Sequence, residues 1–220
     1  MIIQKKLLFT FLAVFFHLFV FSQYALLEDY HDQSGMAIGA KITTFGPGVE
    51  LNVSLNKSIA FRAGAAAFAY KYTQDINTGD AIARNARASL GVISLGLDWQ
   101  FVGFIHLSGG VLYNFSHIDF DVTPSIPTAS NNGTVYYHLV PHKYCPYFLL
   151  GFGRSVSKNR VVSVGFDVGL TYQGKTIVSN EVEGNISEKT LSKWNYNVES
   201  NSRLYNIYPV VSLMIAFRIF

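Results

Sequence analysis

The sequence is poor in three features that would each point to a particular class of protein. It has one cysteine, Cys145, so no disulfide can form within the chain. Only 14% of its residues are charged, and the formal charge of +3 falls to +1 without Lys5 and Lys6. A nucleic-acid partner needs a clustered basic face, so the charge argues against one. After residue 22, no apolar stretch is long enough to cross a membrane as a helix.

The amino-terminal segment has the three parts of a secretory signal. Residues 1–6 contain two lysines, residues 7–21 are apolar apart from Thr10 and His17, and Val20-Phe21-Ser22 offers short side chains at the exit. We predict a signal peptide over residues 1–22, cleaved after Ser22, and one domain over residues 23–220. The alternative is a membrane anchor, but the run is shorter than the roughly 20 residues that a spanning helix needs. No cysteine lies near the exit, which argues against lipoprotein processing.

The chain as a whole is unusually apolar and aromatic for a water-soluble protein. Half of the residues are apolar, and the chain holds 18 glycines, 18 phenylalanines and 13 tyrosines. Apolar surface spread along short alternating strands explains this composition without any helix-spanning segment.

Three segments alternate strictly with a period of two, which predicts strands. The clearest is 162–172, in which Val162, Val164, Phe166, Val168, Leu170 and Tyr172 form one face while Ser163, Gly165, Asp167, Gly169 and Thr171 form the other. Segments 49–55 and 93–100 alternate in the same way. Each of the three carries one carboxylate on its small, polar face: Glu50, Asp98 or Asp167.

Five further segments complete the predicted set of strands: 36–43, 59–70, 103–115, 134–153 and the carboxy-terminal strand ending at Phe220. We interpret 134–153 as one long strand despite Pro141 and Pro146, because a separate hairpin would leave Phe220 on the wrong side. Connections are short at 56–58, 101–103 and 157–159, and long at 73–86, 116–132 and 173–206. Bacterial barrels have short periplasmic turns and longer outer loops. The expected fold is therefore all-β, an eight-stranded antiparallel transmembrane β-barrel.

The alternative fold is a secreted β-sandwich, which would show the same alternation but would bury its apolar face and expose its polar face to water. A sandwich does not predict the alternation of long and short loops, the glycines on the polar face, or the aromatic carboxy-terminal strand. Aromatic residues near the strand ends fit the interfacial girdles of a barrel: Trp99, Phe101, Tyr113, Phe115, Tyr172 and Tyr208.

The charged residues fix which face meets lipid. An arginine or lysine on the lipid face at mid-membrane costs roughly 2–4 kcal/mol, so the charges should point inward. We predict a lumen charge network of Glu50, Arg62, Asp98, Asp167 and Arg218. Unpaired buried charge is expensive, so Arg62 and Arg218 should pair with the carboxylates and plug the narrow tube. A conducting or gating role for the same residues is the alternative.

Four motifs occur in a family's order along the chain: Phe61-Arg62-Ala63-Gly64, the segment 104–114, Pro146-Tyr147-Phe148-Leu149-Leu150-Gly151-Phe152-Gly153, and Tyr208-Pro209-Val210-Val211-Ser212-Leu213. With them, residues 41–220 resemble the small proteobacterial outer-membrane β-barrel family and, more distantly, the OmpA, OmpX and OmpW type of barrel. The resemblance implies an eight-stranded barrel and no settled activity.

Two groups of residues could have a catalytic or metal-binding role instead of a structural one. His106 two residues before Ser108 resembles the outer-membrane lipid A deacylases, in which a histidine activates a serine nucleophile. The phase of the strand points both side chains into the lumen, so we favour a structural role and predict no enzyme. His138, His142 and Cys145 lie close in sequence, but no second cluster completes a tetrahedral site, so we expect no metal and no cofactor.

These inferences predict a protein of the bacterial outer membrane, exported by a cleaved signal, with a structural or surface-interaction role and no catalysis. The alternatives are a narrow OmpW-like pore for small solutes and an esterase using Ser108 and His106. The expected partners are outer-membrane lipid, lipopolysaccharide, and the barrel-insertion machinery, which would bind the carboxy-terminal strand. We expect a monomer. Residues 187–204, a helix or hairpin in an outer loop, are the expected place for surface contacts.

Overall fold

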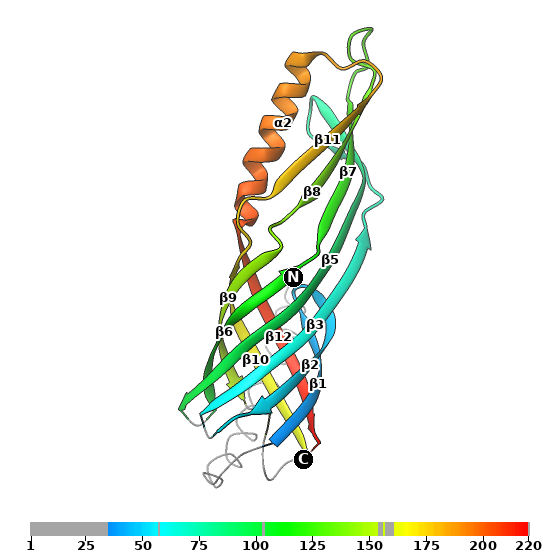
Figure 1. Ribbon diagram of the computed structural model, residues 1–220. Helices are drawn as coiled ribbons and strands as arrows, with labels where there is room; N and C mark the ends of the chain where they lie inside the picture. The colour runs from blue at the N-terminus through cyan, green and yellow to red at the C-terminus, as the bar shows by residue number, and fades with distance from the viewer. Residues whose placement is uncertain (1–34, 57, 103, 154–155, 157–160, 220) are drawn as a thin grey trace, which may run out of the picture.

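The computed structural model describes residues 35–56, 58–102, 104–153, 156 and 161–219. The predicted signal peptide, residues 1–22, lies outside the described residues, as do residues 23–34 of the predicted barrel domain. Figure 1 shows an elongated molecule, with strands wrapped around each other in one half and a helix packed along the strands of the other half. Among the described residues, no helix combines the length and the apolar character that crossing a membrane requires.

Eight strands pair with one another in a closed ring, which we call the ring. They are β1 (Gly35–Thr43), β2 (Gly46–Ser54), β3 (Ile59–Lys71), β5 (Ala81–Val102), β6 (Ile105–Asn114), β9 (Tyr144–Gly153), β10 (Val162–Tyr172) and β12 (Ile207–Arg218). The antiparallel pairings run β5, β3, β2, β1, β12, β10, β9, β6 and return to β5. The pairing of β1 with β12 joins the first described strand to the last.

The remaining elements form an extension beyond one end of the ring. It contains β4 (Ile76–Asn77), the first half of β5, β7 (His117–Pro124), β8 (Thr134–Val140), β11 (Ile177–Glu183), α2 (Glu188–Ser202) and the 3₁₀ helix η1 (Arg203–Asn206). The long strand β5 joins the two parts, because its first half pairs with β7 and its second half with β6. From β7 the sheet continues through β8 to β11.

The described sheet has twelve strands, four more than the sequence predicts. The segments 73–86, 116–132 and 173–206, which we expected to be loops, contain β4, β7, β11 and the start of β5. The prediction of one long strand over 134–153 is also wrong. The pairing breaks between Val140 and Tyr144, where Pro141 has no N–H to donate to a ladder. β8 then pairs with β7 and β11, whereas β9 pairs with β6 and β10.

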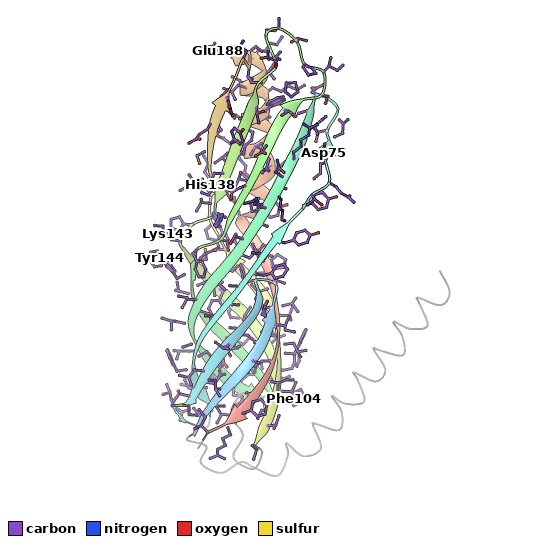
Figure 2. The ribbon with its side chains drawn as sticks, turned by 90° about the vertical axis from the view of Figure 1, so that its right-hand side faces the viewer. Asp75, Phe104, His138, Lys143, Tyr144 and Glu188 are labelled. Atoms are coloured by element: carbon purple, nitrogen blue, oxygen red, sulfur yellow. The ribbon has the colours of Figure 1, made fainter. Side chains whose placement is uncertain are left out.

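The side of the molecule at which the chain ends is nevertheless the one that the turn count requires. The chain runs towards the extension through β6 and then β7, and returns through β8 and then β9. The extra strands therefore lengthen two passes along the molecule and add none. The start of β1 and the end of β12 lie at the same end of the ring, since Ala37 pairs with Arg218. Figure 2 places Phe104 near that end, Lys143 and Tyr144 where the ring meets the extension, and Glu188 far along the extension.

Residues 187–204, predicted as a helix or a hairpin, contain helix α2 (Glu188–Ser202) and the start of η1. Ser187 caps α2, because its hydroxyl accepts a hydrogen bond from the backbone N–H of Thr190 at 3.4 Å. Glu188 lies in the first turn, where a negative charge is favourable for the helix dipole.

Candidate functional site: the charged lumen

Arg62, on β3, lies at the centre of a buried network inside the ring. Its Nε donates to Oε1 of Glu50 at 2.9 Å and its Nη2 to Oε2 of the same carboxylate at 3.1 Å, so the pair is bidentate. Nη2 also donates to Oδ2 of Asp167 at 2.8 Å, and Nη1 to Oδ1 of Asp98 at 3.3 Å. One guanidinium therefore holds three carboxylates from β2, β5 and β10 together.

A serine and a histidine on β6 complete these contacts. Ser108 lies opposite Asp98 in the register of β5 and β6, and its hydroxyl donates to Oδ1 of that carboxylate at 2.5 Å. It also accepts a hydrogen bond from Nη1 of Arg62 at 3.0 Å. His106 has Oδ1 of Asp167 2.9 Å from its Nε2 and the carbonyl oxygen of Gly153 3.2 Å from its Nδ1. Both ring nitrogens therefore face acceptors, which a doubly protonated imidazole satisfies.

Lys41, on β1, is the second fixed cation of the site. Its Nζ donates to Oε2 of Glu50 at 2.8 Å and to Oγ of Ser94 at 3.5 Å. We call the seven residues Lys41, Glu50, Arg62, Asp98, His106, Ser108 and Asp167 the Arg62 network. Its three carboxylates are balanced when Lys41, Arg62 and a protonated His106 are all charged. Each charged member is at most 8% exposed, so this balance avoids an uncompensated buried charge.

The structure thus brings four of the five predicted lumen residues together and places the fifth elsewhere. Arg218 lies at the last position of β12, six residues beyond Ser212, the register partner of Asp167. At about 3.3 Å per residue, this separation is roughly 20 Å along the strand.

Sequence reasoning missed Lys41 as a member, although it lies on the polar face of its predicted strand. It placed His106 and Ser108 in the lumen with a structural role but did not include them in the charge network. The alternation of the strands could have revealed this role, because it places His106 and Ser108 on the inward face together with Asp98 and Arg62. Inward side chains of neighbouring strands must face one another in so narrow a tube.

Glycines make room for these side chains. A Cβ added at Gly151 would lie 2.0 Å from Nε2 of His106 and 2.4 Å from Oδ1 of Asp167. A Cβ at Gly96 would lie 2.1 Å from the hydroxyl of Tyr147, and one at Gly64 would lie 2.6 Å from Nζ of Lys41. The lumen is therefore filled to contact distance at the level of the network.

An apolar layer closes the ring between the network and the extension. It consists of Phe45, Ala66, Val92, Leu112, Cys145, Tyr147, Leu149 and Val210, with Tyr208 packed against it. A cavity of about 40 Å³ lies between this layer and the network, lined by both. On the other side of the network, a cavity of about 30 Å³ is bordered by Asp98, His106 and Val156. These spaces are small and lie on opposite sides of the ion pairs.

The histidine and serine that resemble a catalytic pair are not arranged for nucleophilic catalysis. A general base must be within hydrogen-bond reach of the serine hydroxyl. Here the hydroxyl of Ser108 bonds Asp98 and Arg62, while both nitrogens of His106 are engaged by Asp167 and Gly153. Ser108 is completely buried, so an acyl ester cannot reach it without opening the network.

The three residues weighed as metal ligands do not converge. His138 pairs with Asp119 on β7, and His142 contacts the backbone of Tyr144. Cys145 is buried, and its thiol donates to the carbonyl oxygen of His142 at 3.0 Å. Among the described residues, no group of three or more histidine, cysteine, aspartate or glutamate side chains could hold a metal ion.

The outer surface of the ring has the opposite character to its lumen. Large apolar side chains point outward from every ring strand, as the sticks on the lower half of Figure 2 show. Ile42 is 67% exposed, Val49 59% and Phe148 59%. Aromatic pairs flank this surface: Trp99 with Phe101 towards the short connections, and Tyr113 with Tyr144 at the other end of the ring.

Comparisons with known proteins give structural neighbours alone. No protein-family model matches the chain, and no curated protein sequence matches it. The crystal structure of Acinetobacter baumannii CarO2 aligns with 84% of this chain and 98% of its own, at a TM-score of 0.59 and 18% identity. That of Acinetobacter baumannii CarO covers 83% and 97%, at a TM-score of 0.56 and 16% identity. A major outer membrane protein from Thermus thermophilus aligns at a TM-score of 0.45 and 13% identity, over 84% and 99% of the two chains.

At this level of identity the likeness concerns the fold. The chain has the antiparallel all-β fold of outer-membrane β-barrel proteins, as the alternating strands predict. The more distant resemblance to OmpA, OmpX and OmpW stays an expectation.

Proposed function

We propose that the protein is an eight-stranded β-barrel of the bacterial outer membrane, with a closed lumen and a surface-exposed extension that has a structural or surface-interaction role without catalysis. One observation carries the proposal: burial on the ring is inverted relative to a water-soluble protein. Arg62 is 4% exposed and Glu50 3%, whereas Ile42 is 67% exposed. A sandwich would bury its apolar face, and only a hydrocarbon environment makes this arrangement favourable.

Strand length supports the membrane-spanning role of the ring. A tilted transmembrane strand needs about 9–11 residues. Strands β1 and β2 have 9 residues, β6 and β9 have 10, β10 has 11 and β12 has 12. The aromatic pairs at the two ends of the ring lie where interfacial girdles are expected.

The same proposal includes the processing and orientation of the chain. Residues 1–22 would be removed on export, and the carboxy-terminal strand would be bound by the barrel-insertion machinery. Lipopolysaccharide would surround a monomeric barrel, with the extension outside the cell.

Cysteines introduced in a Cys145→Ser background test this orientation. An impermeant maleimide should label Tyr196→Cys on α2 in intact cells, and should label Ser58→Cys only after the outer membrane is opened. Labelling with the reverse pattern would contradict it.

A closed lumen predicts the absence of steady ion flow. Ion pairs fill the cross-section at the Arg62 network, and the apolar layer around Phe45 and Tyr147 adds a second barrier. Purified protein inserted into planar bilayers should show no steady conductance above that of protein-free bilayers. Large steady currents from wild-type protein would overturn the closed lumen and favour the alternative.

The alternative, a narrow pore for small solutes, rests on the cavities of about 40 and 30 Å³ on either side of the network. Arg62 would have to rearrange to connect these two cavities into a path.

The esterase alternative loses support because both nitrogens of His106 are engaged by other groups. Ser108→Ala should leave lipid A acylation in cells unchanged, and an altered acylation pattern would restore the esterase hypothesis.

A further inference from the structure

The extension contains a cavity of about 640 Å³ that is open to the outside on one side and is far larger than the spaces inside the ring. Its walls come from α2, from the inward faces of β5 and β7, and from Leu139 of β8. Its floor includes Phe45 and Tyr208. Close-packed protein interiors rarely contain voids larger than a water molecule. Ligand pockets, in contrast, typically measure about 300–1,000 Å³. The size alone therefore sets this space apart from a packing defect.

Helix α2 is held over the cavity by a set of specific contacts. Trp194 is buried against Ala81, Val122, Val135 and Tyr137. The hydroxyl of Tyr137 donates to Oδ1 of Asn195 at 2.8 Å, and burial raises the pKa of Tyr137 to about 12, so the donor proton is retained at neutral pH. Lys193 pairs with Asp80 at the start of β5. These contacts fix α2 in place, so the cavity beneath it is a defined part of the fold.

The floor separates the cavity from the lumen. Phe45 packs against Tyr208 with ring centroids 5.0 Å apart, and Phe45 is 2% exposed. The Tyr208 hydroxyl donates to the carbonyl oxygen of Thr44 at 3.3 Å, and the Thr44 hydroxyl donates to the carbonyl oxygen of Pro209 at 3.1 Å. These contacts tie the β1–β2 turn to β12. A molecule in the cavity is held above the ring rather than led into it.

The chemistry of the lining defines what the cavity would accept. Its apolar wall includes Ile118, Phe120, Val122, Leu139 and Trp194. Among the described residues that line it, none is a lysine, arginine, aspartate or glutamate, and the one histidine, His117, has its Nε2 3.8 Å from Oδ2 of Asp119. Asn197 and Asn201, one helical turn apart on α2, provide uncharged hydrogen-bonding groups on one side. An ionic ligand would lose its hydration and would meet no lysine, arginine, aspartate or glutamate side chain in return. An apolar ligand with a neutral polar group has little hydration to lose.

We propose that the extension cavity binds an uncharged, drug-sized molecule with an apolar body and a hydrogen-bonding end placed near Asn197 and Asn201. The inference rests on the proposed function for the location of the site outside the cell, and it supplies a ligand class for the surface-interaction role. Binding itself is a property of the purified protein and can be measured without any assumption about location.

The two tryptophans of the chain allow a direct measurement. Trp99 lies on the lipid-facing surface and Trp194 lines the cavity. In a Trp99→Phe background, Trp194 alone reports on the site. The probe is N-phenyl-1-naphthylamine, an uncharged apolar fluorophore, added to the protein in lipid vesicles. We expect saturable quenching of Trp194 at one probe per chain, and at least about tenfold weaker quenching by the anionic 8-anilino-1-naphthalenesulfonate.

Two variants and a matched control assign the signal to the cavity. Asn197→Asp with Asn201→Asp adds two charges to the lining without changing its shape, and should weaken probe binding about tenfold or more. Ala88→Phe should do the same by filling space on the β5 wall. Ser192→Asp with Ser200→Asp adds the same charge to α2 at exposed positions that do not line the cavity, and should leave binding unchanged. An unshifted Trp194 emission maximum verifies that α2 stays docked in each variant. If Ala88→Phe shifts this maximum, the isosteric variant Asn197→Asp with Asn201→Asp alone decides where the probe binds.

Quenching that rises linearly with probe in the lipid, or that is equal in all variants, would overturn the cavity as the binding site. Equal binding of the sulfonate probe would overturn the uncharged ligand class. Heat-modifiable migration in detergent gels, the sign of a folded barrel, is recorded on the same samples. A folded barrel without saturable binding contradicts only this inference, whereas the absence of a folded barrel contradicts the proposed function.

Discussion

At the scale of single residues, Arg62 is the side chain on which the lumen most depends. It bonds Glu50, Asp98 and Asp167 simultaneously, and it is buried with them. Removing one partner of a buried ion pair leaves an uncompensated charge, which costs far more than the pair itself contributes. The stability of the ring should therefore be asymmetric, sensitive to the loss of Arg62 and tolerant of changes at exposed ion pairs.

We expect Arg62→Met to lower the free energy of unfolding of the barrel in lipid vesicles by about 3–5 kcal/mol, because three carboxylates then share fewer cations. Denaturant titration followed by gel mobility measures this. Arg84→Met is the control, since Arg84 and Asp75 are about half exposed and such pairs contribute at most about 1 kcal/mol. Equal losses in the two variants would contradict the central role of Arg62.

Gly151 offers a second test at this scale. Alanine there would place a methyl group 2.0 Å from Nε2 of His106, so the His106–Asp167 contact would have to move. We expect Gly151→Ala to destabilise the barrel by about 1–3 kcal/mol. Gly109→Ala is the matched control on the neighbouring strand β6, where the nearest atom to an added Cβ is 4.0 Å away. If both variants unfold at the wild-type denaturant concentration, the lumen is less tightly packed than the structure indicates.

At the scale of elements, the strands of the ring were predictable and the extension was not. The strict alternation of residues 162–172 identifies β10, because exposed apolar side chains on one face and packed small or polar ones on the other give a period of two. The extension faces water and a cavity, so its pattern is weaker and its loops are polar. Even so, Ile118, Phe120 and Val122 alternate with His117, Asp119 and Asp121, and this signal for β7 was hidden by the expectation of a long loop.

The candidate site shows the same limit. Inward phase alone brought Glu50, Arg62, Asp98 and Asp167 together, but phase does not give height along the axis. Arg218 shares the inward phase and lies at the end of β12, because strand register sets the level of each residue in the tube. The extension cavity depends on residues from β5, β7, β8 and α2, whose pairing needed the folded structure.

Helix α2 should behave as an element that can separate from the ring. Trp194 is 5% exposed and supplies the largest side chain of its packing face. We expect Trp194→Ala to cost about 3–5 kcal/mol of helix docking, which would expose residues 188–202 to protease and to rapid hydrogen exchange. The ring should keep its heat-modifiable migration. Tyr196→Ala, at a position 72% exposed on the same helix, is the control and should change neither reading.

At the scale of the whole molecule, the interior is a series of compartments along one axis. The 640 Å³ cavity of the extension is followed by the Phe45 layer, a 40 Å³ space, the Arg62 network and a 30 Å³ space. Two different barriers, one apolar and one ionic, therefore lie between the extension and the short-connection end. Opening either one should leave the other in place.

This arrangement predicts that conduction requires a combined change. Arg62→Ser with Asp167→Ser removes one cation and one anion and so keeps the network balanced, while Phe45→Ala thins the apolar layer. We expect planar-bilayer recordings to show no steady current for Phe45→Ala and at most a small one for the Ser pair. The triple variant should conduct, because both barriers are then breached and water can hydrate the remaining charges. Steady current from the Ser pair equal to that of the triple variant would show that the Phe45 layer is no barrier.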